Sequence, residues 1–272
     1  MKGDDMAGDN EGFYYSGQVI GIIKETRTTE FFKRTFSKVP KDYKEDFLPG
    51  SLENASSFEY PVQYKALDIS QCPEGPRTLT PSPKLGKSMV KKAKELEVEG
   101  ARIVSTDCGF YVYFQDAMTE GLSIPVCTSA LLVVPLVSKL IGRNKRVGII
   151  TWDSRALSKE HLRRAGIDES IKIAVVGYEK WAEKRSPMFH ADANLLPEKR
   201  LEMLEEDLVS ASKELIQKHP DVGAIVLECT AFPPAAYAVQ RATGLPVFDI
   251  VMLLNWIGDA VVRKRYPPAP TL

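Results

Sequence analysis

Short runs of apolar and mostly β-branched residues recur along this chain of 272 residues. They are largely apolar rather than alternating regularly with polar residues, which is typical of strands buried on both faces of a parallel sheet. The pattern predicts strands over Val19–Ile23, Ala101–Ser105, Val147–Thr151, Ile171–Val176 and Ala224–Leu227.

Longer segments with helical periodicity separate several of these strands. Lys84–Glu99 and Arg200–Lys218 each repeat apolar residues at the spacing that gives a helix one apolar face. Leu131–Ile141 and Val251–Arg263 are further apolar stretches that we expect to be helical. Strands that alternate with amphipathic helices predict an α/β fold, with parallel sheets covered by helices on both faces.

The second half of the chain repeats the first in order and spacing. Residues 18–26 (QVIGIIKET) match residues 145–153 (KRVGIITWD), and residues 100–110 (GARIVSTDCGF) match residues 223–232 (GAIVLECTAF). In each half, the second of these segments is a strand that leads into a cysteine. A repeat of this length predicts two lobes of the same architecture.

The spacing after the two matched cysteines repeats as well. Val126 follows Cys108 by 18 positions and Val247 follows Cys229 by 18 positions, each directly after a proline. Each Pro-Val step leads into one of the apolar helical stretches. We expect residues 1–130 and 245–272 to form the lobe that carries Cys108, and residues 131–244 to form the lobe that carries Cys229.

Composition and charge narrow the class of protein. Lys and Arg number 36, as do Asp and Glu, so the net charge is zero and we expect no nucleic-acid partner. The apolar run Ile124–Ile141 is interrupted by polar residues, so we expect no membrane span. The acidic N-terminal sequence lacks the apolar core of a signal peptide, which favours a cytoplasmic protein. A homo-oligomer is possible.

In a reducing compartment, the four cysteines are expected to be thiols. Cys72 and Cys127 are expected to pack in the core. Cys108 and Cys229 occupy the same place in the repeat, at the carboxyl end of a strand, where open α/β sheets bind ligands. These two thiols are therefore expected on opposite sides of one pocket between the lobes. With three scattered histidines and no CxxC pair, no metal site is expected.

The motifs that contain these two cysteines, DCGF (107–110) and ECTAFPP (228–234), resemble the aspartate/glutamate racemase superfamily. This superfamily includes hydantoin racemases, arylmalonate decarboxylases and maleate isomerases. The resemblance covers most of the chain and implies two flavodoxin-like lobes, a cysteine from each lobe beside the substrate's stereocentre, and no cofactor. Ala231 and the Lys24-Glu25-Thr26 turn depart from the glutamate racemase pattern, which argues against glutamate as the substrate.

Two opposing thiols suit a reaction in which a proton leaves one face of a carbon and returns to the other. The ordinary thiol pKa of about 8.5 can be lowered toward working pH by a helix N-terminus. We expect Cys108 and Cys229 to be the acid and base of a cofactor-independent racemase or epimerase. Its small carboxylate or amide substrate would be an amino acid or a hydantoin-like compound. Alternatives are a decarboxylase or a maleate-type cis–trans isomerase of the same fold, and a non-catalytic two-lobed protein that binds small molecules.

Residues next to the cysteines and at the strand ends are the candidates for binding the substrate. Backbone amides and one hydroxyl are expected to hold its carboxylate, at Gly109, Phe110, Thr230 and Ala231. Side chains that end the first strand of each half are expected to line the same cleft, at Glu25, Thr26, Thr151 and Asp153.

Asp107 and Glu228 directly precede the two cysteines, and two interpretations of them remain open. Either carboxylate could face the thiol and raise its pKa. Alternatively, successive strand residues point to opposite faces, and each carboxylate would then point away from the cleft. We include Asp107 among the candidate substrate-binding residues.

The segment Thr26–Tyr60 is rich in phenylalanine and has no sustained periodicity. Long loops of this kind are often lids over a binding site, although packing on the body of the protein is the alternative. Trp181–Pro197 occupies the corresponding stretch of the second half, and within it His190 is expected to be a solvated loop residue.

Overall fold

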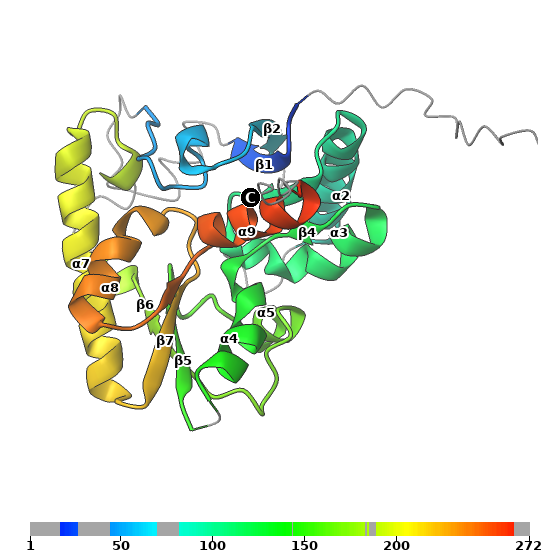
Figure 1. Ribbon diagram of the computed structural model, residues 1–272. Coiled ribbons are helices and arrows are strands. Elements are labelled where there is room, and N and C mark those ends of the chain that lie inside the picture. The colour runs from blue at the N-terminus through cyan, green and yellow to red at the C-terminus, as the bar shows by residue number, and fades with distance from the viewer. Residues whose placement is uncertain are drawn as a thin grey trace, which may run out of the picture.

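The computed structural model describes residues 17–26, 44–69, 82–142, 144–182, 184 and 189–263. Within these residues the chain forms two four-stranded parallel sheets with helices packed beside them, which confirms the predicted α/β class (Figure 1). Each lobe contains one sheet. The short 3-10 helices are η1 (Ala55–Ser57), η2 (Gly109–Phe114), η3 (Ala130–Val133), η4 (Phe189–Ala191) and η5 (Pro233–Ala235).

The first sheet has the strand order β2-β1-β3-β4. Its strands are β1 (Ile20–Thr26), β2 (Val62–Asp68), β3 (Ile103–Thr106) and β4 (Val126–Cys127), and all neighbours are parallel. The helices of this lobe are α2 (Pro83–Val98) and α3 (Gln115–Gly121). The α2 helix begins where the Ser82 hydroxyl accepts a hydrogen bond from the Leu85 N–H, and its buried face is the apolar face expected from the sequence.

The second sheet has the equivalent order, β6-β5-β7-β8. Its strands are β5 (Arg146–Thr151), β6 (Ile173–Gly177), β7 (Val222–Leu227) and β8 (Val247–Phe248), again parallel throughout. The helices that follow these strands are α5 (Lys159–Arg164), α6 (Glu179–Ala182), α7 (Pro197–Lys218) and α8 (Ala236–Thr243). The same order in both sheets confirms the pseudo-symmetric lobes predicted from the repeat.

The last helix of each half packs against the lobe formed by the other half. The α4 helix (Val134–Leu140) follows β4 of the first sheet but contacts β5 of the second. The α9 helix (Ile250–Val261) follows β8 of the second sheet and contacts β3 of the first. The sequence places the return to the first lobe at residue 245, but the pairing of β8 with β7 puts this boundary after Phe248.

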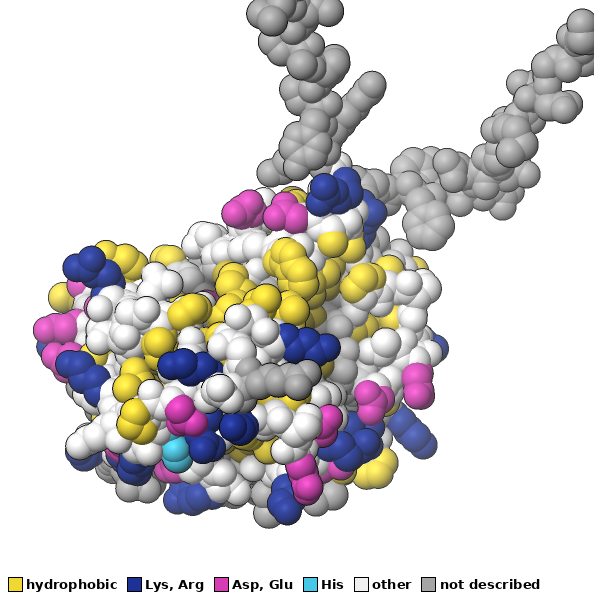
Figure 2. Space-filling view, turned by 60° about the horizontal axis from the view of Figure 1, so that its bottom comes forward, with side chains coloured by type: hydrophobic (Ala, Val, Ile, Leu, Met, Phe, Trp, Pro, Cys, Tyr) yellow, Lys and Arg dark blue, Asp and Glu magenta, His cyan; other side chains and the backbone are white. Residues whose placement is uncertain are grey.

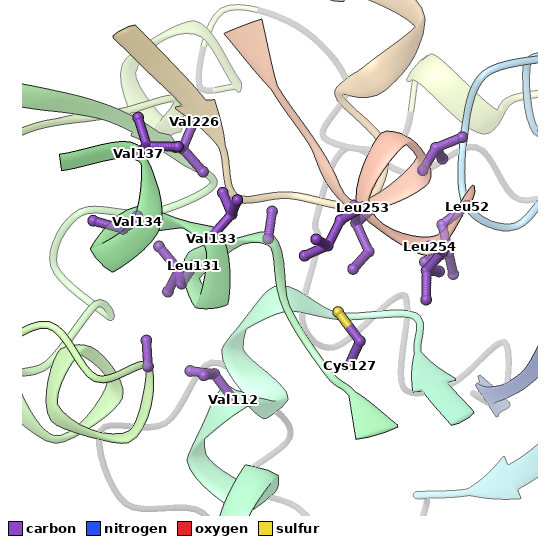
Figure 3. Packing of buried hydrophobic residues seen from close by; sticks show 14 of the residues in the cluster. Leu52, Val112, Cys127, Leu131, Val133, Val134, Val137, Val226, Leu253 and Leu254 are labelled. Atoms are coloured by element: carbon purple, nitrogen blue, oxygen red, sulfur yellow. The ribbon is translucent and has the colours of Figure 1, made fainter. Parts of the chain in front are cut away.

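Because of this exchange, one hydrophobic cluster extends through both lobes. It includes residues of β1 and β3 together with residues of β5 and β7, and the exchanged helices contribute to it. In Figure 3, Val137 of α4 lies beside Val226 of β7, while Leu254 of α9 lies beside Leu52 of the first lobe. The predicted helix over Leu131–Ile141 is divided into η3 and α4, with Pro135 in the first turn of α4, where a missing N–H is tolerated.

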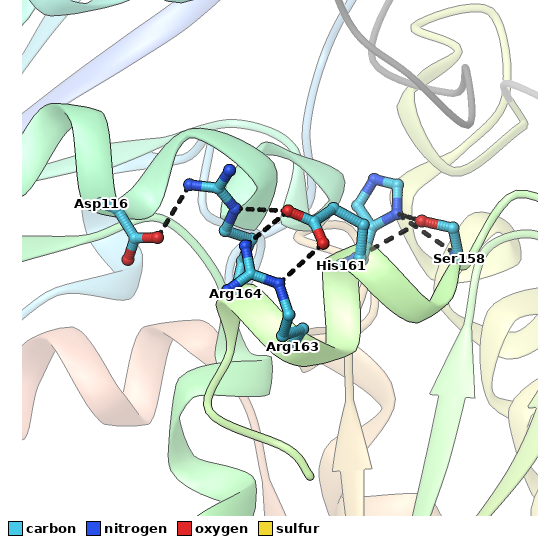
Figure 4. A network of polar contacts seen from close by, with 6 residues as sticks. Asp116, Ser158, His161, Arg163 and Arg164 are labelled. Carbon is cyan, nitrogen blue, oxygen red and sulfur yellow. Dashed lines mark hydrogen bonds and ion pairs between the residues drawn. The ribbon is translucent and has the colours of Figure 1, made fainter.

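A second contact between the lobes involves α5 and η2 (Figure 4). Arg164 of α5 forms an ion pair with Asp116 of α3 at 2.8 Å. His161 of the same helix is fully buried and packs edge-on against Phe110, with ring centroids 5.5 Å apart. The two lobes are therefore joined by polar and apolar contacts on this side as well.

The face shown in Figure 2 has hydrophobic side chains gathered near its middle, with Lys and Arg interspersed among Asp and Glu around them. Across the part of the chain that the structure describes, none of the helices combines the length and the apolar character needed to cross a membrane.

Candidate active site

A pocket of about 90 Å³ lies at the carboxyl ends of β1, β3, β5 and β7. This is the edge at which parallel α/β sheets bind ligands. Both lobes contribute to it, as does the segment 44–53 that follows the first strand. It is lined by Lys24, Glu25, Glu45, Phe47, Glu53, Asp107, Cys108, Gly109, Phe110, Trp152, His190, Glu228, Cys229, Thr230 and Ala231.

The two predicted thiols both line this pocket and lie in turns of the same geometry. Cys108 follows β3, and its carbonyl accepts a hydrogen bond from the Tyr111 N–H at 3.0 Å. Cys229 follows β7, and its carbonyl accepts one from the Phe232 N–H at 3.1 Å. Each cysteine is half-buried. The repeat seen in the sequence therefore places one thiol from each lobe in a single pocket.

The turns after the thiols are 3-10 helices rather than the α-helix N-termini expected from the sequence. Cys108 precedes the 3-10 helix η2, and α3 begins only at Gln115. Cys229 lies four residues before η5, and α8 begins at Ala236. The expected carboxylate site on a helix dipole is therefore not formed by an α-helix at either cysteine.

The carboxylates that precede the thiols occupy equivalent positions. The Asp107 Oδ2 atom accepts a hydrogen bond from the Glu25 N–H at 2.8 Å. The Glu228 Oε2 atom accepts one from the Trp152 N–H at 3.3 Å, and Trp152 matches Glu25 in the repeat. The buried Thr151 hydroxyl donates a second bond to Glu228 at 2.8 Å. Both carboxylates line the pocket, so neither points away from the cleft.

These carboxylates act on the first thiol. Burial raises the pKa of the Cys108 thiol well above its ordinary value, and the nearby charges of Glu25, Glu228 and Asp107 raise it further. The Phe110 N–H lowers this pKa, but by less. Cys108 is therefore a neutral thiol in the protein without ligand. The expectation that a helix N-terminus would lower the pKa of this thiol is wrong, because burial and three nearby carboxylates raise it instead.

The loops of the two thiols touch directly. A Cβ atom at Gly109 would overlap the Glu228 carboxylate and the Glu228 backbone oxygen, so only glycine fits there. We expected Gly109 to permit a tight turn, but its φ is not positive, and the close approach of Glu228 is the physical reason for glycine. On the other side of the contact, the Thr230 hydroxyl lies 2.9 Å from the Asp107 carbonyl and 3.0 Å from Glu53 Oε1.

Residues 44–53 cover the pocket and are held by the second lobe. Their backbone pairs with residues 191–193, where the Asp46 N–H donates to the Ala191 carbonyl at 2.8 Å. Arg200 of α7 is only 1 % exposed and forms an ion pair with the Asp46 carboxylate at 2.5 Å. The same guanidinium also contacts the Asp46 carbonyl. We call this stretch the roof segment; residues 27–43 of the predicted lid lie outside the described residues.

A comparison with known protein families identifies the chain. Residues 54–256, about three quarters of the sequence, match the profile of the family described as Asp/Glu/Hydantoin racemase. The chain belongs to the Asp/Glu/hydantoin racemase family. The resemblance drawn from the two cysteine motifs is thereby confirmed, and the chain is a member of a family of enzymes.

Two curated relatives of this family member are described as lyases. The chain is 32 % identical over 213 residues to a dimethylsulfoniopropionate lyase of Durusdinium sp. clade D, which covers 75 % of the chain and 67 % of the relative. It is 27 % identical over 223 residues to dimethylsulfoniopropionate lyase 7 of Emiliania huxleyi (strain CCMP1516), which covers 77 % of the chain and 62 % of the relative. The chain thus spans about two thirds of the length of these relatives.

Solved structures with the racemase-family fold are more distant in sequence. An aspartate racemase homologue from Pyrococcus horikoshii is 16 % identical with a TM-score of 0.53, over 89 % of this chain and 99 % of that one. Unliganded arylmalonate decarboxylase is 18 % identical with a TM-score of 0.52, over 93 % of this chain and 96 % of that one. These similarities establish the shared two-lobed fold.

Most, but not all, of the predicted site residues of this racemase-family chain lie in the pocket. Glu25, Asp107, Gly109, Phe110, Thr230 and Ala231 line it together with the two thiols. Thr26 is exposed and does not line it. Thr151 lies behind the pocket and holds Glu228, and Asp153 bonds to Arg155 instead. Cys127 is buried in the core as predicted, and Cys72 lies outside the described residues.

Several pocket residues were missed by sequence reasoning. His190 is 5 % exposed and lines the pocket, so the expectation of a solvated loop residue is wrong. Trp152 could have been found, because it matches Glu25 in the repeat. No such signal marks Lys24, Glu45, Phe47 and Glu53 in the sequence. The last three lie in the roof segment, which reaches the pocket because its backbone pairs with residues 191–193. Among the described residues, no cluster of three or more His, Cys, Asp or Glu side chains is arranged to hold a metal ion.

Proposed function

We propose that this protein is a lyase that removes a proton next to a carboxylate and expels a positively charged group from the adjacent carbon. Dimethylsulfoniopropionate, named in the description of the curated relatives, is the proposed substrate. The observation that carries the proposal is the grouping of Glu25, Asp107 and Glu228 around the neutral thiol of Cys108.

The charges of the pocket favour a substrate with a cationic group. Glu25, Asp107 and Glu228 would repel a purely anionic ligand, whereas a sulfonium group placed among them would offset their charge. The aromatic rings of Phe47 and Trp152, which also line the pocket, suit a soft organic cation. A racemase substrate with only a carboxylate lacks this complementarity.

Lys24 provides the opposite charge that a zwitterionic substrate requires. Its Nζ atom lies 3.0 Å from Glu45 Oε2 and 4.6 Å from the centroid of the Phe47 ring. In this proposal, Lys24 faces the substrate carboxylate while the sulfonium group lies among the carboxylates of the thiol loops. The two ends of the substrate would then be held in one orientation, with the carbon next to the carboxylate between the thiols.

The elimination proceeds by one proton transfer and one bond cleavage. Because Cys108 is held as a neutral thiol, Cys229 is the base in this proposal and takes the proton from the carbon next to the carboxylate as a thiolate. The electron pair of that C–H bond forms the carbon–carbon double bond, and the C–S bond breaks with its electrons on sulfur. Acrylate and neutral dimethyl sulfide leave, and the proton on Cys229 returns to solvent. Cys108 donates a hydrogen bond to the carboxylate as negative charge develops there.

The test measures product release by the full chain and by cysteine variants. We expect dimethyl sulfide in the headspace and acrylate by proton NMR in equal amounts, and loss of both in Cys229→Ser. Cys108→Ser should retain part of the rate, since serine can still donate a hydrogen bond. Cys127→Ser is the matched control, because that thiol is buried away from the pocket. Absence of both products with the wild-type chain, or full activity of Cys229→Ser, would contradict the proposal.

Racemisation is a second candidate, because thiols from two different lobes line the same pocket. The same first proton transfer would then be followed by protonation from Cys108 on the opposite face. Incubation in D₂O with amino acids, hydantoins, arylmalonates and maleate, followed by NMR and chiral chromatography, separates the possibilities. Deuterium incorporation with inversion indicates a racemase, loss of carbon dioxide a decarboxylase, and fumarate a cis–trans isomerase.

A further inference from the structure

Glu53 is a pocket residue to which the proposed chemistry assigns no role. It lies in the roof segment, and its side chain reaches the contact between the two thiol loops. Its Oε1 atom is 3.0 Å from the Thr230 hydroxyl oxygen, and its Oε2 atom is buried without a hydrogen-bond partner. Thr230 directly follows Cys229, so any force on its hydroxyl acts on the loop that carries this thiol.

The hydrogen bonds around Thr230 require one more proton than an ionised Glu53 provides. The Thr230 hydroxyl carries one hydrogen but has two oxygen neighbours, Glu53 Oε1 and the Asp107 carbonyl at 2.9 Å. The Asp107 carbonyl can only accept. The hydroxyl must therefore donate to Asp107, and Glu53 satisfies the other contact only if it is a carboxylic acid that donates to Thr230.

The electrostatic surroundings agree with this count. The pKa of Glu53 is raised to about 7, because burial and, to a smaller extent, the Glu45 charge outweigh its backbone N–H, Thr230 and Lys24, which lower it. On the other side, Tyr64 of β2 donates to the Leu52 carbonyl at 2.8 Å and remains neutral, because burial raises its own pKa. The other titratable groups lining the pocket are Glu25, Asp107, Cys108, His190, Glu228 and Cys229.

We propose that Glu53 is a positioning residue that acts as a neutral acid. Its proton completes a series of hydrogen bonds from Glu53 through Thr230 to Asp107, and this series fixes the Cys229 loop against the Cys108 loop. The link to turnover rests on the proposed function, in which both thiols act on one substrate. The hydrogen-bond chain itself does not depend on the reaction.

Loss of this proton has a direct structural consequence. Once Glu53 is ionised, its carboxylate and the Asp107 carbonyl compete for the one hydrogen of Thr230, and one contact becomes two facing lone pairs. The loops then separate or the Thr230 hydroxyl turns, so that the distance between the thiols is no longer fixed. Glutamine at this position keeps a donor for Thr230 and cannot ionise, whereas leucine removes the donor.

Two measurements on the full chain without substrate test this series of hydrogen bonds. Infrared difference spectra between about pH 6 and pH 8 should show a carboxylic-acid band that disappears at the higher pH and is absent in Glu53→Gln. Hydrogen exchange of segments 107–110 and 229–232 should be faster at the higher pH in wild type than in Glu53→Gln, and fast at both pH values in Glu53→Leu. An unchanged infrared band in Glu53→Gln, or equal exchange in wild type and Glu53→Gln, would overturn the proposal.

Turnover provides the readout that a merely structural role would not change. With Glu53 half ionised near pH 7, the ratio of kcat/KM for Glu53→Gln to that of wild type should rise about tenfold between about pH 6 and pH 8. The ratio cancels the titration of the thiols, which both proteins share. A constant ratio overturns the role in turnover. If no product forms at any pH, the lyase proposal fails, while the infrared and exchange results still decide the role of Glu53.

Discussion

The buried histidine between the lobes gives a measurable dependence of stability on pH. His161 Nδ1 accepts a hydrogen bond from the Ser158 N–H at 3.2 Å and lies 2.6 Å from the Ser158 hydroxyl (Figure 4). The Nε2 atom is buried without a partner. Burial lowers the pKa of His161 to about 4, and the Glu160 charge offsets only part of this effect. Protonation of Nδ1 would remove the acceptor for the Ser158 N–H and place a charge against Phe110.

The magnitude follows from the difference between folded and unfolded pKa. Below about pH 6.5 the unfolded chain binds a proton that the folded chain refuses until about pH 4. The free energy of unfolding therefore falls as the pH falls through this window, because the unfolded state is the one that gains protons. Each pH unit contributes about 1.4 kcal/mol, so the His161 contribution between about pH 7 and pH 4 is about 3 kcal/mol.

Urea denaturation of wild type and His161→Gln, followed by tryptophan fluorescence at a series of pH values, measures this term. The difference in free energy of unfolding between the two proteins should decrease by about 3 kcal/mol from about pH 7 to pH 4. His219→Gln is the control: this half-buried residue ends α7 and bonds to Leu215 through its backbone N–H. A difference between wild type and His161→Gln that does not change with pH would refute the argument.

Three further predictions concern the pocket and the core. Gly109→Ala should lower the free energy of unfolding by about 3 kcal/mol in denaturant titration and reduce turnover, because the new Cβ displaces Glu228 from Thr151 and Trp152. Arg200→Met should raise KM about tenfold with a smaller effect on kcat in steady-state kinetics, because the roof segment loses its anchor at Asp46. Cys127→Ser should lower the melting temperature, at a cost of about 1–2 kcal/mol for a buried hydroxyl, while activity per folded molecule is retained.

The inner strands and the edge strand β6 could be predicted from the sequence, whereas the other edge strands, β2, β4 and β8, could not. The strands β1, β3, β5 and β7 each contain a continuous apolar run because they are covered on both faces, and that pattern predicts a buried strand. The edge strand β2 contains polar and half-buried residues, so its sequence resembles a loop. The strands β4 and β8 have two residues each, which is too short for any periodicity.

The residues of the candidate site also divide into those that the sequence predicts and those that it does not. The two thiols were predicted because position in the repeat fixes them at the same edge of two equivalent sheets. The roof segment was only partly anticipated, because its contacts join Asp46 to Ala191 and Arg200, far along the chain. The effect of the carboxylates on Cys108 was left open, because the repeat fixes their positions but not the direction in which each side chain points.

The exchange of α4 and α9 between the lobes makes the two halves inseparable as folding units. A fragment that ends before α4 lacks no strand of the first sheet, yet it also lacks α9, which covers β3 of that sheet. Each half produced alone would expose an apolar sheet face. The two halves produced together would cover both faces, because each half supplies the helix that packs on the sheet of the other. A hinge motion between the two sheets would have to disrupt the hydrophobic cluster that both lobes share.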